Sequence, residues 1–188
     1  ASTKNNMIEG LFPGVGKSTL AKNFDKDSLF VCPYNVLCQV LKKENFNSVT
    51  YNKVFGLYGS EKESSFLKRF DISKYKTIVF DEIYLYEPYK LKKIDELIRA
   101  NPDKIFLGTG DCDQRDPIGF NDSEYIKNCI NMMFGSKIKL NIIKRLTNEE
   151  DKIRWVKLKE DIFNVKLSVE EVCKRNKIKT IKSMNKVK

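Results

Sequence analysis

The chain has 188 residues, enough for a domain that buries its core without disulfides or structural metals. Its 35 Lys and Arg against 25 Asp and Glu give a formal charge of +10, which favours a polyanionic partner. The absence of His excludes a Cys/His zinc site. The five cysteines include no C-x-x-C pair, so we expect free buried thiols in a reducing, intracellular compartment. No apolar run approaches the ~20 residues of a membrane span.

Residues 7–20 read M-I-E-G-L-F-P-G-V-G-K-S-T-L, which is an apolar run, a Gly-rich turn and a helix start. This is most of the phosphate-binding pattern G-x-x-x-x-G-K-[ST], with Leu11 where the first Gly is expected and Gly10 beside it. We expect Lys17, exposed at the helix start, to reach the β- and γ-phosphates, and the Ser18 hydroxyl to ligate Mg²⁺. The residues expected to bind the nucleotide are Pro13, Gly14, Val15, Gly16, Lys17, Ser18 and Thr19.

The spacing of apolar residues predicts strands that alternate with helices. Strands are expected at 28–33, 48–52, 77–83, 105–111 and 138–143, and helices at 88–100, at 122–134 and after a cap at Asn35. Residues 59–76 are polar and Lys-rich, as in a surface connection. This alternation is typical of an α/β domain whose parallel sheet has helices on both faces.

Two of the predicted strands end in acidic residues. The run T-I-V-F-D-E-I places Asp81 and Glu82 at a carboxyl end, where open α/β sheets have their sites. Asp81 would hold Mg²⁺ and Glu82 would polarise the attacking water. The run I-F-L-G-T-G-D-C-D-Q would bring the amide of Gln114 near the terminal phosphate, as a sensor, unless it is only a polar turn.

The character of the chain changes at Asn148. Residues 148–163 predict one long charged helix, Ser168 caps a short helix, and the tail after Asn176 is basic. We therefore expect an NTPase domain over residues 1–147. Residues 148–188 are expected to be a charged helical extension, at most the start of a second lobe.

The motifs, in chain order, resemble those of superfamily 1 helicases. F-P-G-V-G-K-S-T resembles the first motif, and V-C-P-Y-N and S-V-T-Y-N resemble two segments that face single-stranded nucleic acid. F-D-E-I, G-T-G-D-C-D-Q and L-N-I-I-K-R-L resemble motifs II, III and IV. The resemblance covers roughly residues 6–147. Its departures are Leu11 and the absence of the second lobe's motifs.

The resemblance implies a RecA-like fold, ATP and Mg²⁺ as cofactors, and ATP hydrolysis coupled to movement on single-stranded DNA or RNA. It implies that Glu82 is the catalytic base, that Gln114 couples γ-phosphate to nucleic acid, and that Arg145 approaches the γ-phosphate. It also implies a second RecA-like lobe as partner. The residues that would face the single strand are Pro33, Tyr34, Asn35, Thr50 and Tyr51, although the two tyrosines are also compatible with packing roles. The character of the sequence suggests a large DNA virus or a related replicon.

Two other classes of function fit the phosphate loop. A P-loop kinase of a small acceptor would need a lid with arginines and would leave the Gly-Asp-x-x-Gln strand unexplained. A non-catalytic module would bind nucleic acid and use nucleotide only as a structural ligand. Transfer of labelled phosphate to an acceptor identifies the first, and equal stabilisation by ADP and a nonhydrolysable ATP analogue, without hydrolysis, identifies the second.

Overall fold

The computed structural model describes residues 5–10, 14–57, 70–113, 122–143, 146–163 and 167–177. They contain a six-stranded sheet in which all neighbouring pairs are parallel, in the order β3-β2-β4-β5-β1-β6. The predicted parallel α/β fold is therefore confirmed. The strands are β1 (Asn6–Gly10), β2 (Leu29–Cys32), β3 (Asn47–Thr50), β4 (Thr77–Phe80), β5 (Ile105–Gly110) and β6 (Ser136–Leu140).

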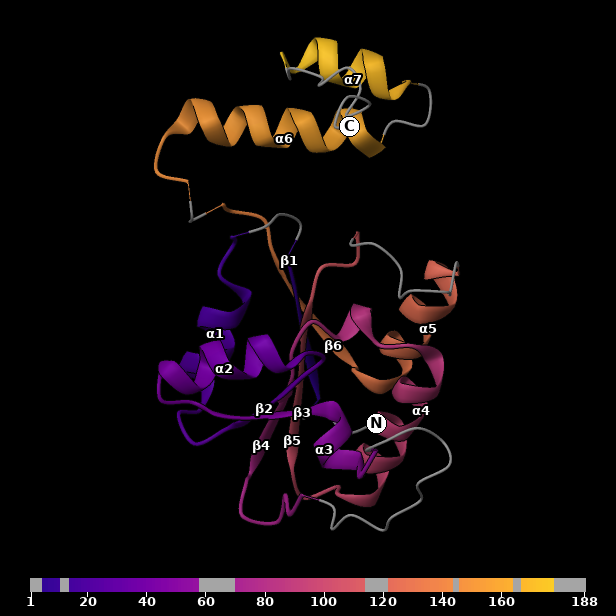
Figure 1. The fold of residues 1–188 in the computed structure, drawn as a ribbon. Coiled ribbons are helices and arrows are strands. Elements are labelled where there is room, and N and C mark those ends of the chain that lie inside the picture. Colours follow the sequence, from indigo (N-terminus) through magenta and orange to yellow (C-terminus); the bar gives the residue numbers. More distant parts are fainter. Residues whose placement is uncertain are drawn as a thin grey trace, which may run out of the picture. The chain divides into compact units, whose positions relative to one another are not determined.

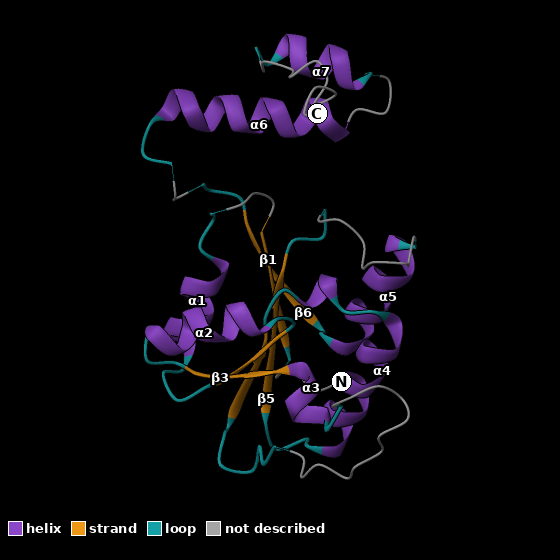
Figure 2. Cartoon of the chain, in the orientation of Figure 1, coloured by secondary structure: helices purple, strands orange, loops and turns teal. Residues whose placement is uncertain are grey.

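Helices cover both faces of this sheet, as Figure 1 and Figure 2 show. On one face, α1 (Lys17–Phe24) and α2 (Asn35–Lys43) pack over a small core that includes Ile8, Phe30 and Leu107. On the other, a larger core includes residues of three helices, which are α3 (Tyr51–Phe55), α4 (Pro88–Ala100) and α5 (Ser123–Met133). Because the inner strands are covered twice, β2 and β4 are buried along their whole length.

Most predicted elements lie within a few residues of the observed ones, and three local predictions are wrong. The third strand ends at Thr50, and Tyr51 begins helix α3 where the strand was expected to continue to residue 52. Asn35 is the first residue of α2 and not its cap, a position that Tyr34 occupies without a side-chain hydrogen bond. A short helical turn, η1 (Ile83–Leu85), follows β4 where the strand was expected to run to residue 83.

The chain divides into two compact units, Ala1–Ile142 and Ile143–Lys188. The second contains the predicted helices, α6 (Glu149–Phe163) and α7 (Val169–Arg175), and Ser168 caps α7 in a capping box with Glu171. Within this unit the Asn176 amide donates to the buried Asp161 carboxylate at 2.8 Å. The interpretation of residues 148–188 as the start of another lobe remains a prediction.

Five free thiols are present, as expected. Cys32 and Cys38 are buried, whereas the other three are partly exposed, so the expectation of burial holds for two of the five. Over the described ranges, no helix combines the length and the apolar character that crossing a membrane requires.

Candidate nucleotide-binding site

The Gly-rich turn between β1 and α1 has the backbone of a phosphate-binding loop in its described part. Gly14 and Gly16 have φ angles of 76° and 97°, in the left-handed region that favours glycine, and α1 begins directly after Gly16. The amide groups of the first turn of α1 therefore have no partner within the helix and suit an anion. Ser18 is half-buried and Thr19 is exposed at this helix start. Pro13 and Leu11 lie outside the described residues.

Lys17 is buried, with 9% of its surface exposed, so the expectation of an exposed lysine is wrong. Side chains of a helix tilt toward its N-terminus, and Lys17 accordingly leans back over the end of β1. A Cβ at Gly10 would lie 2.7 Å from Val15 Cγ2 and 2.9 Å from Lys17 Cδ. Gly10 thus clears the cradle in which the side chains of Lys17 and Val15 pack against the end of β1.

Thr109 joins the two acidic residues that follow β4. Its hydroxyl donates to Asp81 Oδ1 at 2.6 Å and accepts from the Glu82 backbone N–H at 3.3 Å. Thr109 is fully buried on β5, and Asp81 is buried with 6% exposed. Sequence reasoning missed Thr109, although a hydroxyl between two glycines at the end of a buried strand was a usable signal.

Burial raises the pKa of the Asp81 carboxyl, and this effect is opposed by the hydrogen bond from Thr109 and by the charges of Lys17 and Lys22. The charge of Lys17 thus lowers the pKa of this carboxyl, as expected for a lysine on the same side of the sheet as the carboxyl end of β4. A buried carboxylate is a hard oxygen ligand of the kind that Mg²⁺ prefers. The pairing of Lys17 with Asp81 around a nucleotide remains a prediction.

Glu82 adopts a left-handed backbone, with φ 50° and ψ 50°. A bulky residue other than glycine in this region costs of order 1–3 kcal/mol, and such strain clusters at functional sites. The conformation turns the chain abruptly from β4 into η1. It places the residue predicted to be the catalytic base at the carboxyl edge of the sheet, next to the buried Asp81.

A buried network beneath the loop was not predicted. Glu9, with 2% exposed, lies on β1 directly before Gly10. Its carboxylate accepts a short hydrogen bond from the Tyr84 hydroxyl and pairs with Lys137 Nζ on β6 at 2.5 Å. Burial and the neighbouring Glu9 raise the pKa of Tyr84. A single acid within the apolar run M-I-E-G was the available sequence signal.

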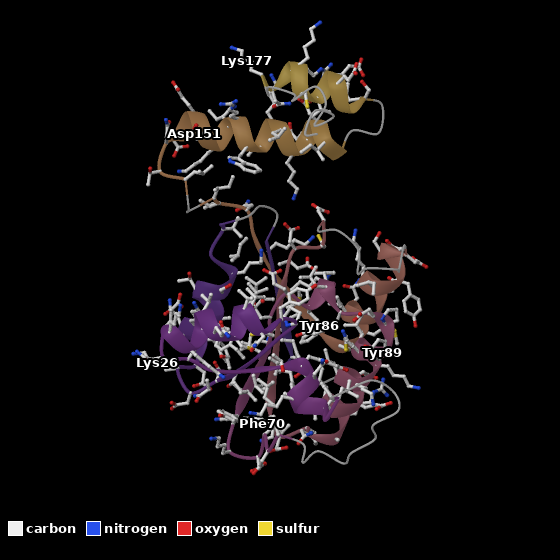
Figure 3. The ribbon with its side chains drawn as sticks, viewed as in Figure 1. Lys26, Phe70, Tyr86, Tyr89, Asp151 and Lys177 are labelled. Carbon is white, nitrogen blue, oxygen red and sulfur yellow. The ribbon has the colours of Figure 1, made fainter. Side chains whose placement is uncertain are left out.

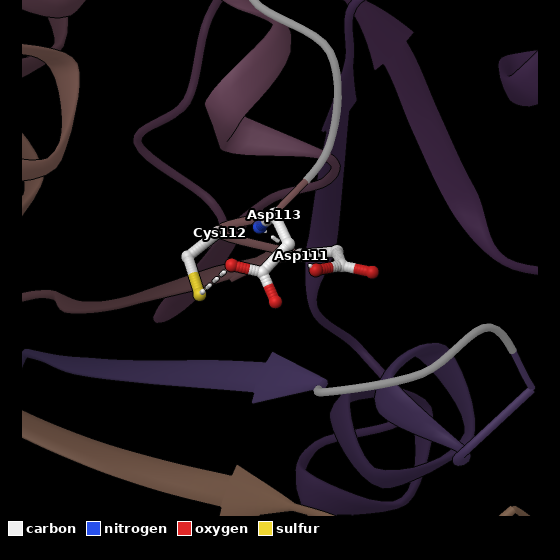
Figure 4. Close-up of side chains that lie close together, drawn as sticks. All are labelled: Asp111, Cys112 and Asp113. Atoms are coloured by element: carbon white, nitrogen blue, oxygen red, sulfur yellow. Dashed lines mark hydrogen bonds between the residues drawn. The ribbon is translucent and has the colours of Figure 1, made fainter. Parts of the chain in front are cut away.

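A second group of potential metal ligands follows β5 (Figure 4). One ligand atom each of Asp111, Cys112 and Asp113 lie within 4.8 Å of one another. The Asp113 backbone N–H donates to Asp111 Oδ1 at 3.0 Å, and the Cys112 thiol lies 3.7 Å from Asp113 Oδ1. This turn follows the strand that carries Thr109. Gln114, the predicted sensor, and Arg145 lie outside the described residues.

The residues predicted to face nucleic acid divide into two groups. Pro33, Tyr34, Asn35 and Thr50 line one groove, and Tyr34 is 53% exposed. Tyr51 is only 1% exposed, its ring packs on Tyr86, and its hydroxyl donates to the Lys90 carbonyl. The prediction that Tyr51 faces the single-stranded nucleic acid is therefore wrong, because its ring is buried and packs inside the protein.

No protein-family profile matches this chain, and no curated protein does. Among solved structures it is similar to Pif1 helicase from Bacteroides in complex with ADP-AlF3 and single-stranded DNA, at 18% identity and a TM-score of 0.58. That match covers 90% of this chain and 45% of the helicase. Bacteroides Pif1 bound to single-stranded DNA gives 18% identity, a TM-score of 0.60, and coverage of 97% and 48%.

Pif1 helicase from Candida albicans has 15% identity and a TM-score of 0.55, with 84% of this chain and 40% of the helicase covered. At these identities the likeness shows the fold alone, which is the RecA-like α/β fold. The chain spans less than half the length of the helicases that it matches.

Proposed function

We propose that this chain is the first RecA-like motor lobe of a superfamily 1 helicase or translocase, which hydrolyses ATP to move along single-stranded nucleic acid. One observation carries the proposal. The buried Lys17, the first residue of α1, packs over Gly10, and its charge lowers the pKa of the buried Asp81. The strained Glu82 directly follows Asp81 in the chain. The similar Pif1 structures, with ADP-AlF3 and single-stranded DNA, support the same assignment.

The roles of the side chains follow from their positions. The N-terminal amides of α1 and the Lys17 ammonium would bind the β- and γ-phosphates. Asp81 and Ser18 would hold Mg²⁺, which supplies charge neutralisation on the phosphate oxygens when it is bound. Thr109 keeps one Asp81 oxygen fixed by donating to it. Glu82 would orient the attacking water and accept its proton.

The proposal assigns different effects to Lys17 and Glu82. Lys17→Ala removes a cation from the phosphates, so we expect nucleotide binding to be lost. Glu82→Gln keeps the size and removes the base, so we expect ATP affinity to be retained while hydrolysis falls by about 10²–10⁴-fold. The measurements are titration with a fluorescent ATP analogue and release of phosphate, with and without single-stranded oligonucleotide.

Two results would contradict this function. ATP affinity equal to that of the parent in the Lys17 variant would show that the loop does not bind phosphate. Transfer of labelled phosphate to a small acceptor, in place of release as free phosphate, would identify a kinase.

Arg145 and a second lobe are proposed to supply the remaining positive charge at the γ-phosphate, since an arginine finger contributes ~10³–10⁵ in rate.

A further inference from the structure

A groove with a volume of about 720 Å³ runs beside β3, the strand at one edge of the sheet. Phe46 and Asn47 line it where β3 begins, and Thr50 lines it where β3 ends. The walls come from α2, from α3 and from the turn before β4. The groove therefore extends from the carboxyl edge of the sheet, at Tyr34 and Thr50, along the whole length of the edge strand.

The walls of this groove are basic. Lys42 on α2, Lys53 on α3 and Lys74 in the turn before β4 all line it, and all three are exposed. Over the described part of the chain, the lining contains no Asp or Glu, and no carboxylate forms an ion pair with any of the three lysines. Asp71 interacts with the charge of Lys74 but lies outside the lining. Three like charges around one groove whose lining has no carboxylate favour an anionic occupant.

Aromatic rings support two of these lysines. Lys53 Nζ lies 5.8 Å from the centre of the Phe70 ring, and Lys74 Nζ lies 5.0 Å from that of Tyr75. Phe70 is labelled in Figure 3. Both rings also line the groove, so these contacts hold the ammonium groups beside it. At the other end, the exposed ring of Tyr34 offers a surface on which a base can stack.

The floor of the groove adds backbone donors. Among the strands that the structure describes, β3 is hydrogen-bonded to β2 alone, because it is the last strand of the sheet. Alternate residues of an edge strand point their N–H and C=O groups away from the sheet. Backbone N–H groups and lysines are the usual protein partners of nucleic-acid phosphates.

We propose that this β3 groove binds single-stranded nucleic acid and extends its path from Tyr34 and Thr50, along the sheet edge, to Lys74. This inference rests on the proposed function, which places the single-stranded nucleic acid at the carboxyl edge of the sheet. The three lysines neutralise phosphates along the extension, and Tyr34 contacts a base at its entrance. A peptide strand without acidic side chains could pair with the same edge, but it would bring no negative charge to the three lysines.

The test compares two triple variants that remove the same charge. The groove variant is Lys42→Ala, Lys53→Ala and Lys74→Ala. The control replaces Lys26, Lys43 and Lys92, which are exposed and lie outside the groove, and Lys43 is the neighbour of Lys42 on α2. Binding of short and long fluorescent oligo-dT is titrated at several salt concentrations, and ATP affinity is measured on the same samples.

The expected size of the effect follows from release of counterions. Each phosphate contact on a single strand contributes ~0.7 to the log–log salt slope, so three lysines contribute about 2. Between ~50 and ~200 mM salt, the parent should therefore lose roughly twentyfold more affinity for long oligo-dT than the groove variant does. The control variant should retain the parent's slope, and ATP affinity should be unchanged in both.

Several outcomes would overturn the groove assignment. Equal slopes in the groove and control variants would mean that the lysines act only through net charge. Parent-like binding of long oligo-dT by the groove variant would show that nucleic acid does not occupy the groove and would favour a peptide strand as its ligand. A parent that binds ATP and short oligo-dT, but whose affinity for long oligo-dT does not depend on these lysines, refutes the groove alone. A parent that binds oligo-dT through these lysines but binds no ATP refutes the proposed ATP-driven function alone.

Discussion

Substitution of Gly10 by Ala tests the cradle that holds the phosphate loop. Gly10 has an extended strand backbone, so alanine meets no conformational penalty there. The added Cβ would lie 2.7 Å from Val15 Cγ2 and 2.9 Å from Lys17 Cδ, and both side chains are buried. Val15 is β-branched and has little freedom at χ1, so the loop that carries it must move.

The magnitude follows from the cost of overpacking. Adding a methyl group to a well-packed site costs typically ~1–3 kcal/mol. If the loop stays in place, this cost appears as a lower free energy of unfolding. If the loop relaxes and the Lys17 ammonium leaves its position, the same cost appears in binding, as an affinity about 5- to 150-fold weaker for ATP. The sum of the two losses should therefore be at least about 1 kcal/mol.

The assay measures urea unfolding and ATP affinity on the same protein. Gly135→Ala is the matched control, because a Cβ there meets no atom within 4 Å and should change neither quantity. Val15→Ala removes the closer clash. Gly10→Ala should therefore cost less when it is added to the Val15→Ala variant than when it is added to the parent. Parent-like stability and parent-like ATP affinity of Gly10→Ala would refute the cradle.

Three further substitutions or reactions test the buried groups around this site. Thr109→Val keeps the shape of the side chain and removes a bond to the buried Asp81 carboxylate, so the free energy of unfolding in urea should fall by ~1.5–3 kcal/mol; an unchanged midpoint would contradict the role given to the hydroxyl. Tyr84→Phe removes a donor to the buried Glu9 and should cost a similar ~1.5–3 kcal/mol in thermal or urea unfolding, and a neutral effect would show that this bond contributes nothing net. Burial raises the pKa of the Cys32 thiol, which lowers its thiolate fraction, so a thiol reagent at pH 8 should label it only after denaturation, as peptide mass spectrometry would reveal; rapid labelling in the folded chain would disprove this burial.

The sequence by itself determined the parts of this protein that depend on neighbours along the chain. The apolar runs before Asp81 and Asp111 predicted buried parallel strands, and the structure has them as β4 and β5. The Gly-rich turn before Lys17 predicted the start of a helix, and α1 begins there, with Gly16 in the left-handed region. These signals are local. A strand that is buried on both faces has a continuous apolar run, and a turn with positive φ has a glycine, so a few consecutive residues are enough to predict either.

Only the tertiary structure decided which distant residues meet. Thr109 reaches Asp81 because β5 lies beside β4, and Glu9 meets Lys137 because β6 lies beside β1. Tyr51 also became buried through distant contacts. Strand order sets these encounters, and the apolar runs of the strands are too alike to specify it. The same strand order leaves β3 at an edge of the sheet, where the basic groove forms. No single stretch of sequence predicts this groove, because its lining comes from separate parts of the chain.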